Sequence, residues 1–347
     1  MVALVEATRT DAGAFPDSEP SGMPVILVGV AGAVALADVC WAASGRFDID
    51  VAAYARLGAL SVLLWLGSLF YARIRKSPDL AAMLFGAGFL VAFAAGFSVL
   101  NYFLLTVAGH RIDTVLAQID RALGVDWPAL MAFVAAHPAL NLLLRLAYIT
   151  VLPQVALLII ALGFCGRANA IYEFCLALAI AAAITIAFWT VFPSFGAFSI
   201  YVLPGEVVHR LHPELGPAYA RDLVALLASG PGRISPDQIK GLIGFPSFHA
   251  AMAVLVVWYG RRLRYLRWPL VAWNIVVLVA TPVHGGHFVV DVIAGLAVVA
   301  PAILLTRRIA LARRRTVQSA AWYPIGIEPP ESSVGDAIDT GRLEPAA

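Results

Sequence analysis

Residues 80–107 read LAAMLFGAGFLVAFAAGFSVLNYFLLTV and contain no Asp, Glu, Lys or Arg. A helix needs about 20 apolar residues to cross the hydrocarbon core of a bilayer, so this run is long enough to span a membrane. Seven further apolar runs lie before and after it. The eight runs are found at 24–44, 53–72, 80–107, 139–163, 171–192, 245–260, 267–283 and 287–306. The sequence therefore predicts an all-α, polytopic transmembrane helix bundle of about eight spans, with short amphipathic surface helices.

The composition agrees with this class of protein. Of the 347 residues, 61% are hydrophobic and 13% are charged, whereas about 25% of a soluble domain is charged. The net charge is only +2, which excludes a protein that binds nucleic acid through a broad basic face. The three cysteines, Cys40, Cys165 and Cys175, lie in or beside apolar runs without a CxxC pattern. Neither a disulfide scaffold nor a thiolate metal site is therefore expected.

Basic residues in the short connections predict the orientation. Lys and Arg gather after the second, fourth, sixth and eighth runs, which fall on one side of an eight-span bundle together with both termini. Because basic loops stay in the cytoplasm, we expect both termini to be cytoplasmic and the long loops 108–138 and 193–244 to face outward. The predicted setting is a bacterial inner membrane, with the outward side in the periplasm.

This orientation divides the chain into four segments. We expect a disordered cytoplasmic N-terminus at 1–23 and N-terminal transmembrane helices at 24–163. A transmembrane core at 164–306 carries the histidine motifs described below, and a basic, then disordered, cytoplasmic tail follows at 307–347.

The two long outward loops contain amphipathic segments. In 111–123, apolar residues fall at helical spacing, with Asp113, Asp120 and two arginines between them. This pattern predicts a helix that lies on the membrane surface, with Trp127 at the level of the lipid headgroups. In the second loop, three leucines just after Arg221 predict another short surface helix.

Two short motifs bring histidines to the outward side. Residues 245–251 read FPSFHAA, where Pro246 suits the first turn of a helix and His249 falls within that turn. The free N–H groups and the positive dipole end of a helix start can bind phosphate. Residues 281–291 read TPVHGGHFVVD, and their Gly-Gly pair permits a tight turn before the eighth run opens at His287.

His287 and Asp291 are four residues apart, so on a helix they share one face and can touch. A carboxylate that accepts the N–H of one imidazole nitrogen leaves the other nitrogen bare, as in a histidine that acts as nucleophile or base. A carboxylate inside an apolar run costs about 2.5–3.5 kcal/mol at the helix centre, and it usually has a function there. We therefore expect His249, His287 and Asp291 to form a catalytic site.

The two motifs resemble the second and third signature motifs of the type 2 phosphatidic acid phosphatase superfamily. Their spelling is most similar to the inositolphosphotransferase branch, which includes fungal inositol phosphorylceramide synthase. The specific match covers about 245–295, and a resemblance at Phe192-Pro-Ser194 is looser. The resemblance implies a catalytic core at 164–306 that moves a phosphoryl or phosphoalcohol headgroup between lipids at the outer leaflet, without a metal or cofactor.

The resemblance also implies a role for each residue. His287 would attack phosphorus and form a phosphohistidine while Asp291 orients its ring. His249 would protonate the departing oxygen and then act as a base toward water or an alcohol. General acid help of this kind accelerates a reaction by about 10²–10⁴.

Departures from the family pattern concern phosphate binding. The third motif usually begins Ser-Arg, but here Ala280 and Thr281 hold those positions, and Phe248 replaces the glycine before the second-motif histidine. A Lys-x6-Arg-Pro first motif is missing from the sequence. Because phosphate needs cations or N–H groups, other residues must supply them. The substrate-binding candidates are Ser247, His284, Lys240, Arg233, Arg221 and Arg145.

The sequence leaves three alternatives open. A plain lipid phosphatase, acting on phosphatidic acid or a polyprenyl pyrophosphate, would use the same residues with water as acceptor. A metal site would use His249, His284, His287 and Asp291 as nitrogen and oxygen ligands. A transporter or haem-binding protein could use a helix broken near Pro153. The expected partners are lipids in the membrane and no nucleic acid, and the oligomeric state stays open.

Overall fold

The computed structural model describes residues 22–44, 47–230, 232–239 and 241–322, with side chains described as far as Arg313. Within these ranges the chain is helical and forms no β-strand, apart from an isolated parallel bridge between Ile49 and Ile234. The prediction of an all-α polytopic bundle is confirmed. The elements are α2 (Met23–Ala42), α3 (Val51–Arg73), α4 (Pro78–Leu104), η2 (Leu105–Val107), α5 (Asp113–Ala122), α6 (Trp127–Ala136), α7 (Pro138–Ile149), α8 (Val151–Phe164), α9 (Ala168–Val191), η3 (Ala197–Ser199), α10 (Gly205–Leu211), α11 (Pro217–Ser229), α12 (Phe248–Gly260), α13 (Arg267–His284) and α14 (Val289–Trp322).

Among the described residues, five helices are long and apolar enough to cross a membrane, namely α2, α3, α4 with η2, α9 and α14. The other three predicted runs are helical but shorter or interrupted. The run at 139–163 is divided at Thr150 into α7 and α8, while α12 has 13 residues and α13 has 18. A further apolar pair, α6 and α7, bends by 112°. The helix that starts at the first motif and the helix that ends at the second, α12 and α13, are therefore shorter than the membrane-length helices of the bundle.

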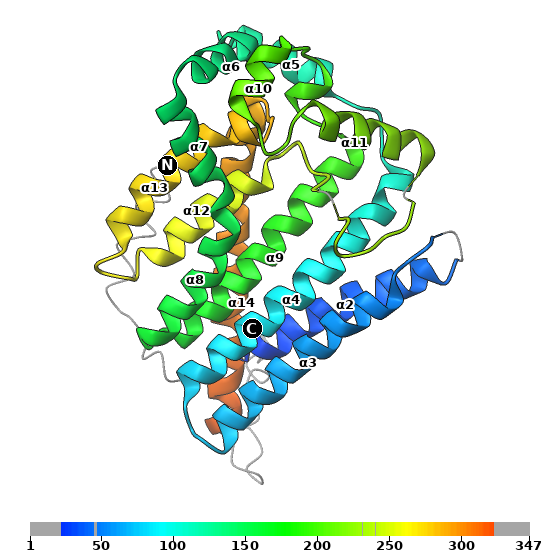
Figure 1. Ribbon diagram of the computed structural model, residues 1–347. Coiled ribbons are helices and arrows are strands. Elements are labelled where there is room, and N and C mark those ends of the chain that lie inside the picture. The colour runs from blue at the N-terminus through cyan, green and yellow to red at the C-terminus, as the bar shows by residue number, and fades with distance from the viewer. Residues whose placement is uncertain (1–21, 45–46, 231, 240, 323–347) are drawn as a thin grey trace, which may run out of the picture.

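Four short helices, α5, α6, α10 and α11, gather at one end of the bundle, and we call them the cap (Figure 1). The turns that join α3 to α4, α8 to α9 and α12 to α13 lie on the opposite side, at the lower left of the same view. The cap covers the ends of α9, α12, α13 and α14, where the two histidine motifs lie.

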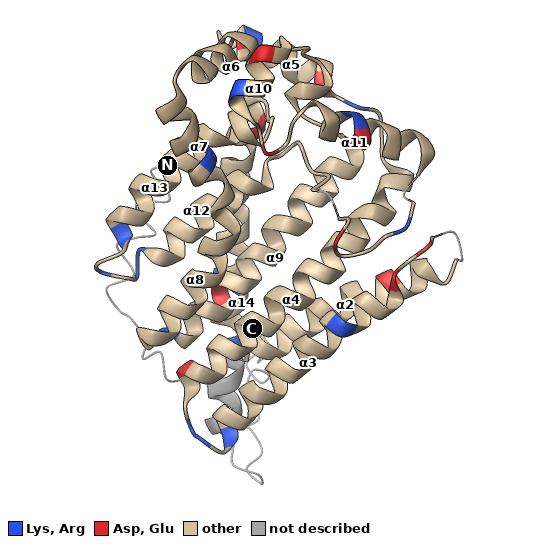
Figure 2. Cartoon of the chain, in the orientation of Figure 1, with Lys and Arg blue, Asp and Glu red and all other residues tan. Residues whose placement is uncertain are grey.

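Charged residues are distributed differently on these two sides. The cap contains acidic and basic residues together, while the charged residues on the opposite side are mainly basic (Figure 2). The turns there contain, among others, Arg75, Arg167 and Arg264. The orientation expected from the sequence, in which the basic side is cytoplasmic, stays a prediction.

The scaffold under the site is α9, the most buried of the membrane-length helices. It packs against α4, α12 and α14, and its buried positions include a series of alanines at 177, 179, 181 and 182. Small side chains let helix backbones approach closely in a membrane protein, so packing rather than a hydrophobic driving force holds such contacts. The end of α9 therefore gives a fixed base for the loop that follows it.

The last helix is longer than expected. The sequence predicts that the eighth span ends at 306 and that disorder begins at about 316, but α14 continues to Trp322. Residues 1–21 and 323–347 lie outside the described residues, so the disorder expected for most of the N-terminus and for the end of the tail stays a prediction.

Two expectations for the loop 108–138 are wrong. A helix does form there, as α5, but Asp113 and Asp120 are buried instead of facing water or headgroups. Trp127 is fully buried, and its indole N–H donates to the carbonyl oxygen of Pro282 at 3.1 Å. That carbonyl belongs to the last turn of α13, where backbone oxygens have no partner within the helix. The cap thus packs on the bundle through its polar groups as well as its apolar ones.

Candidate active site

His287 and Asp291 are in contact at the start of α14. The helix begins at Val289, two residues later than the sequence suggests, so His287 lies in the turn just before it. The Nδ1 atom of His287 is 3.2 Å from Oδ2 of Asp291, and both side chains are buried. The same oxygen accepts the backbone N–H of Phe288 at 2.9 Å. The carboxylate therefore fixes both the ring and the turn that carries it, and Nδ1–H is the donor.

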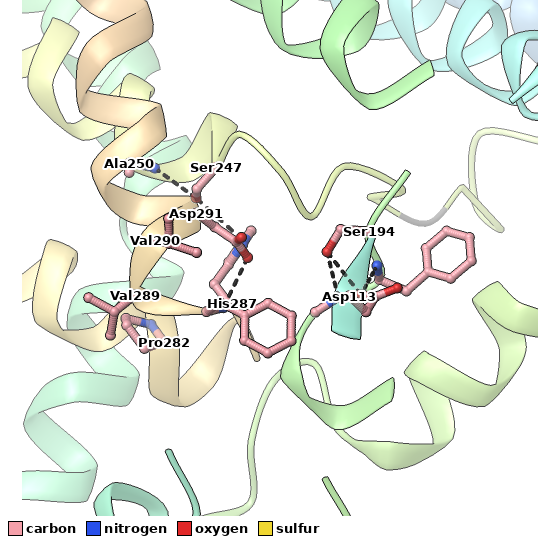
Figure 3. A network of polar contacts seen from close by, with 12 residues as sticks. Asp113, Ser194, Ser247, Ala250, Pro282, His287, Val289, Val290 and Asp291 are labelled. Atoms are coloured by element: carbon pink, nitrogen blue, oxygen red, sulfur yellow. Dashed lines mark hydrogen bonds and ion pairs between the residues drawn. The ribbon is translucent and has the colours of Figure 1, made fainter. Parts of the chain in front are cut away.

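The other ring nitrogen of His287 faces Ser247. Nε2 lies 3.4 Å from the Ser247 hydroxyl, which also accepts the N–H of Ala250 and so caps α12 (Figure 3). Pro246 precedes this cap and stands outside the helix, contrary to the expectation that it occupies the first turn. The N–H of Ser247 donates to the carbonyl oxygen of Asp291 at 3.0 Å. Backbone contact between the two motifs thus places Nε2 at the start of α12.

A glycine makes this close approach possible. Gly295 is one turn beyond Asp291 in α14, and a Cβ at this position would lie 2.3 Å from the carbonyl oxygen of Ser247. Real Cβ atoms do not come so close to backbone, so only glycine permits the observed packing of α14 on the start of α12.

His249 lies in the first turn of α12 and contacts Tyr148 at the end of α7. Its Nε2–H donates to the carbonyl oxygen of Tyr148 at 3.2 Å, and its ring stacks on the Tyr148 ring with centroids 4.3 Å apart. A Cβ on Gly285 would lie 2.8 Å from Tyr148 and 2.9 Å from the His287 ring. Tyr148, at the end of α7, is therefore a neighbour of both histidines, and the sequence carries no signal that would have singled it out.

The loop after α9 lies near His287, and its residues Phe195 and Gly196 line the same small cavity as that histidine. Its hydrogen bonds converge on Asp113, which accepts the Ser194 hydroxyl at 2.9 Å and the N–H groups of Phe195 and Gly196 at 2.8 and 3.1 Å (Figure 3). The guanidinium of Arg111 pairs with the other carboxylate oxygen at 2.8 Å. The segment with the looser resemblance, Phe192-Pro-Ser194, therefore belongs to the loop beside the site. The sequence does not indicate that Asp113 is the hydrogen-bond partner of this loop.

A small cavity of about 20 Å³ lies beside His287. It has room for about one water molecule. Its lining comes from four segments, namely Phe195 and Gly196, then Leu215, Tyr219 and Leu223, then 241–244, and finally Gly285 and His287. The Tyr219 hydroxyl donates to the carbonyl oxygen of Gly241 and so connects α11 to the segment before α12. In this conformation the nucleophile candidate is almost closed off by the cap.

The described basic candidates, Arg145, Arg221 and Arg233, are not part of the cavity lining. Arg145 pairs with Glu214 at 2.6 Å, and Arg233 pairs with Asp50 at 3.0 Å. The two side chains are 46% and 57% exposed. Arg221 is exposed on α11, and Lys240 lies outside the described residues. Of the six substrate-binding candidates, the structure places Ser247 in direct contact with His287.

His284 is fully buried at the end of α13, and neither ring nitrogen has a hydrogen-bond partner among the described residues. Its carbonyl oxygen accepts the N–H of Leu215 at 2.9 Å and so tethers the loop before α11. The four residues of the metal-site alternative do not converge, since among the described residues no three His, Cys, Asp or Glu side chains could hold a metal ion.

A membrane-embedded helical bundle with a His–Asp pair and a second histidine at the start of a neighbouring helix belongs to the class of membrane-bound phosphotransfer enzymes. A family model described as the PAP2 superfamily matches residues 114–305, from α5 into α14, and the chain belongs to this superfamily. Members are phosphatases and phosphotransferases, so the protein is an enzyme of this type. No curated protein and no solved structure matches the chain. The predicted superfamily is confirmed, and the inositolphosphotransferase branch stays a prediction.

Proposed function

We propose that the protein is a membrane lipid phosphotransferase that works through a phosphohistidine on His287. The observation that carries the proposal is the contact of His287 Nδ1 with Asp291, which leaves Nε2 directed at Ser247 beside the cavity. A nucleophile held in one tautomer by a buried carboxylate is the arrangement that covalent catalysis by histidine requires.

The reaction would proceed in two balanced steps. First, the Nε2 lone pair of His287 attacks phosphorus, the bond from phosphorus to the leaving oxygen breaks, and a protonated His249 gives its proton to that oxygen. Then the hydroxyl of an acceptor attacks phosphorus, its proton passes to His249, and the P–N bond breaks to regenerate His287. Because His249 Nε2 donates to the Tyr148 carbonyl, its Nδ1 is the nitrogen left for proton transfer.

The negative charge of the phosphate would be met mainly at the start of α12. Ser247 contacts Nε2 of His287, so a phosphoryl group that replaces this contact would lie near the first backbone N–H groups of α12. We further propose that this mouth faces the periplasmic side of a bacterial inner membrane, with both termini cytoplasmic. Lipid headgroups of the outer leaflet are then the substrates, in keeping with the inositolphosphotransferase-like motif spelling.

The test combines covalent trapping with acceptor analysis. Membranes with the wild type, His287→Ala or Asp291→Asn receive a lipid with a radioactive phosphate, and protein-bound label is checked for the acid lability of a phosphohistidine. Fluorescent ceramide and diacylglycerol are supplied as acceptors. A fluorescent phospholipid made only by the wild type supports the transferase, and turnover by His287→Ala at the wild-type rate excludes the mechanism.

A lipid phosphate phosphatase is the second candidate, and one observation favours it. The cavity beside His287 has room for about one water, which is the acceptor in hydrolysis. In this case the same experiment releases inorganic phosphate, and no fluorescent phospholipid accumulates with either acceptor.

A further inference from the structure

The helix α5 contacts both the loop after α9, which lines the cavity beside His287, and the first turn of α14, which follows His287. Asp113 and Asp120 are seven residues apart, so they project from the same face of α5. Both are buried, although carboxylates are rarely buried without partners. Asp113 accepts hydrogen bonds from the loop after α9, and Asp120 accepts them from the first turn of α14.

The first segment held by α5 is the loop after α9, where Asp113 accepts the Ser194 hydroxyl and two consecutive backbone N–H groups. These two backbone groups belong to Phe195 and Gly196, which line the cavity. Arg111 pairs with the remaining oxygen, so this carboxylate makes an ion pair in addition to its three hydrogen bonds.

The second segment held by α5 is the first turn of α14, which follows the lining residue His287. Asp120 Oδ2 accepts the N–H of Val289 at 2.8 Å, and Oδ1 accepts the N–H of Val290 at 2.9 Å. These are two of the four N–H groups that lack a partner at a helix start, and the negative charge also suits the positive end of the helix. The turn held in this way contains Phe288 and Asp291, which bind one another and orient His287.

We propose that α5 is a positioning strut, in which Asp113 and Asp120 fix the spacing between the Phe195–Gly196 wall and the turn that carries the nucleophile. Asp113 and Asp120 touch no reacting atom, so both are positioning residues. This inference rests on the proposed function, because it assumes that His287 is the reacting group. Its consequence is that a change on the cap, away from the reacting atoms, alters the chemical step.

Asp120→Asn keeps the volume of the side chain and changes only its hydrogen-bonding groups, so it tests the strut without a change in packing. Asparagine offers one acceptor oxygen, so one of the two N–H groups faces an NH2 group instead and the first turn of α14 shifts. A displacement of about 1 Å from reactive geometry costs about 10²-fold in rate. We expect kcat to fall about 10- to 100-fold, with KM within about threefold of wild type and with slower phosphohistidine formation in a single turnover.

A second variant removes the donor instead of the acceptor. Val289→Pro deletes the N–H that Asp120 Oδ2 accepts, at the first position of α14, where proline fits a helix. The matched control is Asp126→Asn, since Asp126 caps α6 by accepting the N–H of Ala129 at 2.9 Å and is exposed on the same cap. This control should keep the wild-type kcat, KM and rate of phosphohistidine formation.

All variants are compared per amount of folded protein, from thermal unfolding of the full chain in detergent. A lower kcat with a normal KM in Asp120→Asn or Val289→Pro, but not in Asp126→Asn, supports the strut. If both variants keep the wild-type kcat, or if both yield no folded protein, the strut is overturned, because α5 then serves only stability. His287→Ala is measured alongside, since its activity would defeat the proposed function itself, whereas its inactivity leaves the strut to be judged alone.

Discussion

Asp291→Asn tests the centre of the proposed mechanism. One oxygen of Asp291 accepts both the Phe288 N–H and the His287 Nδ1–H, while Oδ1 is buried with no hydrogen-bond partner among the described residues. An asparagine could therefore keep both contacts by placing its oxygen at the Oδ2 position. Its NH2 group would then occupy the place of Oδ1, buried and unpaired. The fold should survive this change, but the charge opposite the ring is lost.

The size of the effect follows from the burial of the pair. Breaking a buried ion pair by removing one charge costs about 3–5 kcal/mol, and phosphorylation of Nε2 makes the ring of His287 cationic while Nδ1 keeps its proton. Because the lost stabilisation falls on the charged intermediate and the steps around it, it appears in the rate. At about 1.4 kcal/mol per factor of ten, kcat should fall about 10²- to 10⁴-fold while KM changes little.

The assay is the initial rate of lipid phosphate turnover in membranes, together with the yield of acid-labile phosphoprotein. Asp126→Asn serves as the control, because it makes the same chemical change at an exposed carboxylate. Thermal unfolding of both proteins separates a loss of chemistry from a loss of fold. An Asp291→Asn enzyme that stays within about threefold of the wild-type kcat would refute the role of the His287–Asp291 contact.

Three further predictions concern packing, surface charge and metal ions. Gly295→Ala places a Cβ 2.3 Å from the Ser247 carbonyl oxygen, so overpacking should destabilise the fold by about 1–3 kcal/mol and lower activity, whereas Gly29→Ala, in α2 with nothing within 4 Å, should not lower the unfolding temperature. Arg233→Ala breaks an exposed pair with Asp50 that contributes about 1 kcal/mol at most, so KM should not change, and a tenfold rise in KM would instead show that Arg233 binds substrate phosphate. Treatment with a chelator should leave turnover within about twofold of the untreated enzyme, and its abolition would indicate an essential metal ion.

The fold could be predicted from the sequence where the signal is local. Runs such as 80–107 become helices at nearly the expected bounds, because apolar side chains in lipid require a backbone whose hydrogen bonds are satisfied internally. The break at Thr150 lies three residues before Pro153, the residue near which the sequence allows a broken helix, but the contacts that form at the break could not be predicted. The Thr150 hydroxyl accepts the indole N–H of Trp273 and the amide of Gln154, and the first of these partners comes from a distant helix.

In the candidate site, as in the fold, contacts between residues close in the sequence could be predicted and contacts between distant residues could not. The His287–Asp291 contact could be predicted because the two residues are only four apart, although His287 lies in the turn before α14 and not on the helix as expected. The role of Asp120 could not, since its backbone partners lie 169 and 170 residues further along the chain. On an amphipathic helix, two carboxylates on one face are typical of a solvated surface. Only the tertiary structure shows that this face of α5 meets unpaired backbone N–H groups.

The departure from the family motif at Thr281 has a structural explanation. Thr281 is fully buried in α13, and its hydroxyl donates to the Val277 carbonyl oxygen at 2.8 Å. An arginine here would bury a guanidinium, which costs several kcal/mol unless a carboxylate pairs with it. Asp291 and Asp120, the carboxylates at the start of α14, already hold His287 and that first turn. The contacts that direct Nε2 of His287 do not involve position 281, so the change leaves the geometry of the proposed nucleophile intact, and under the proposed mechanism the phosphate must find its positive charge elsewhere.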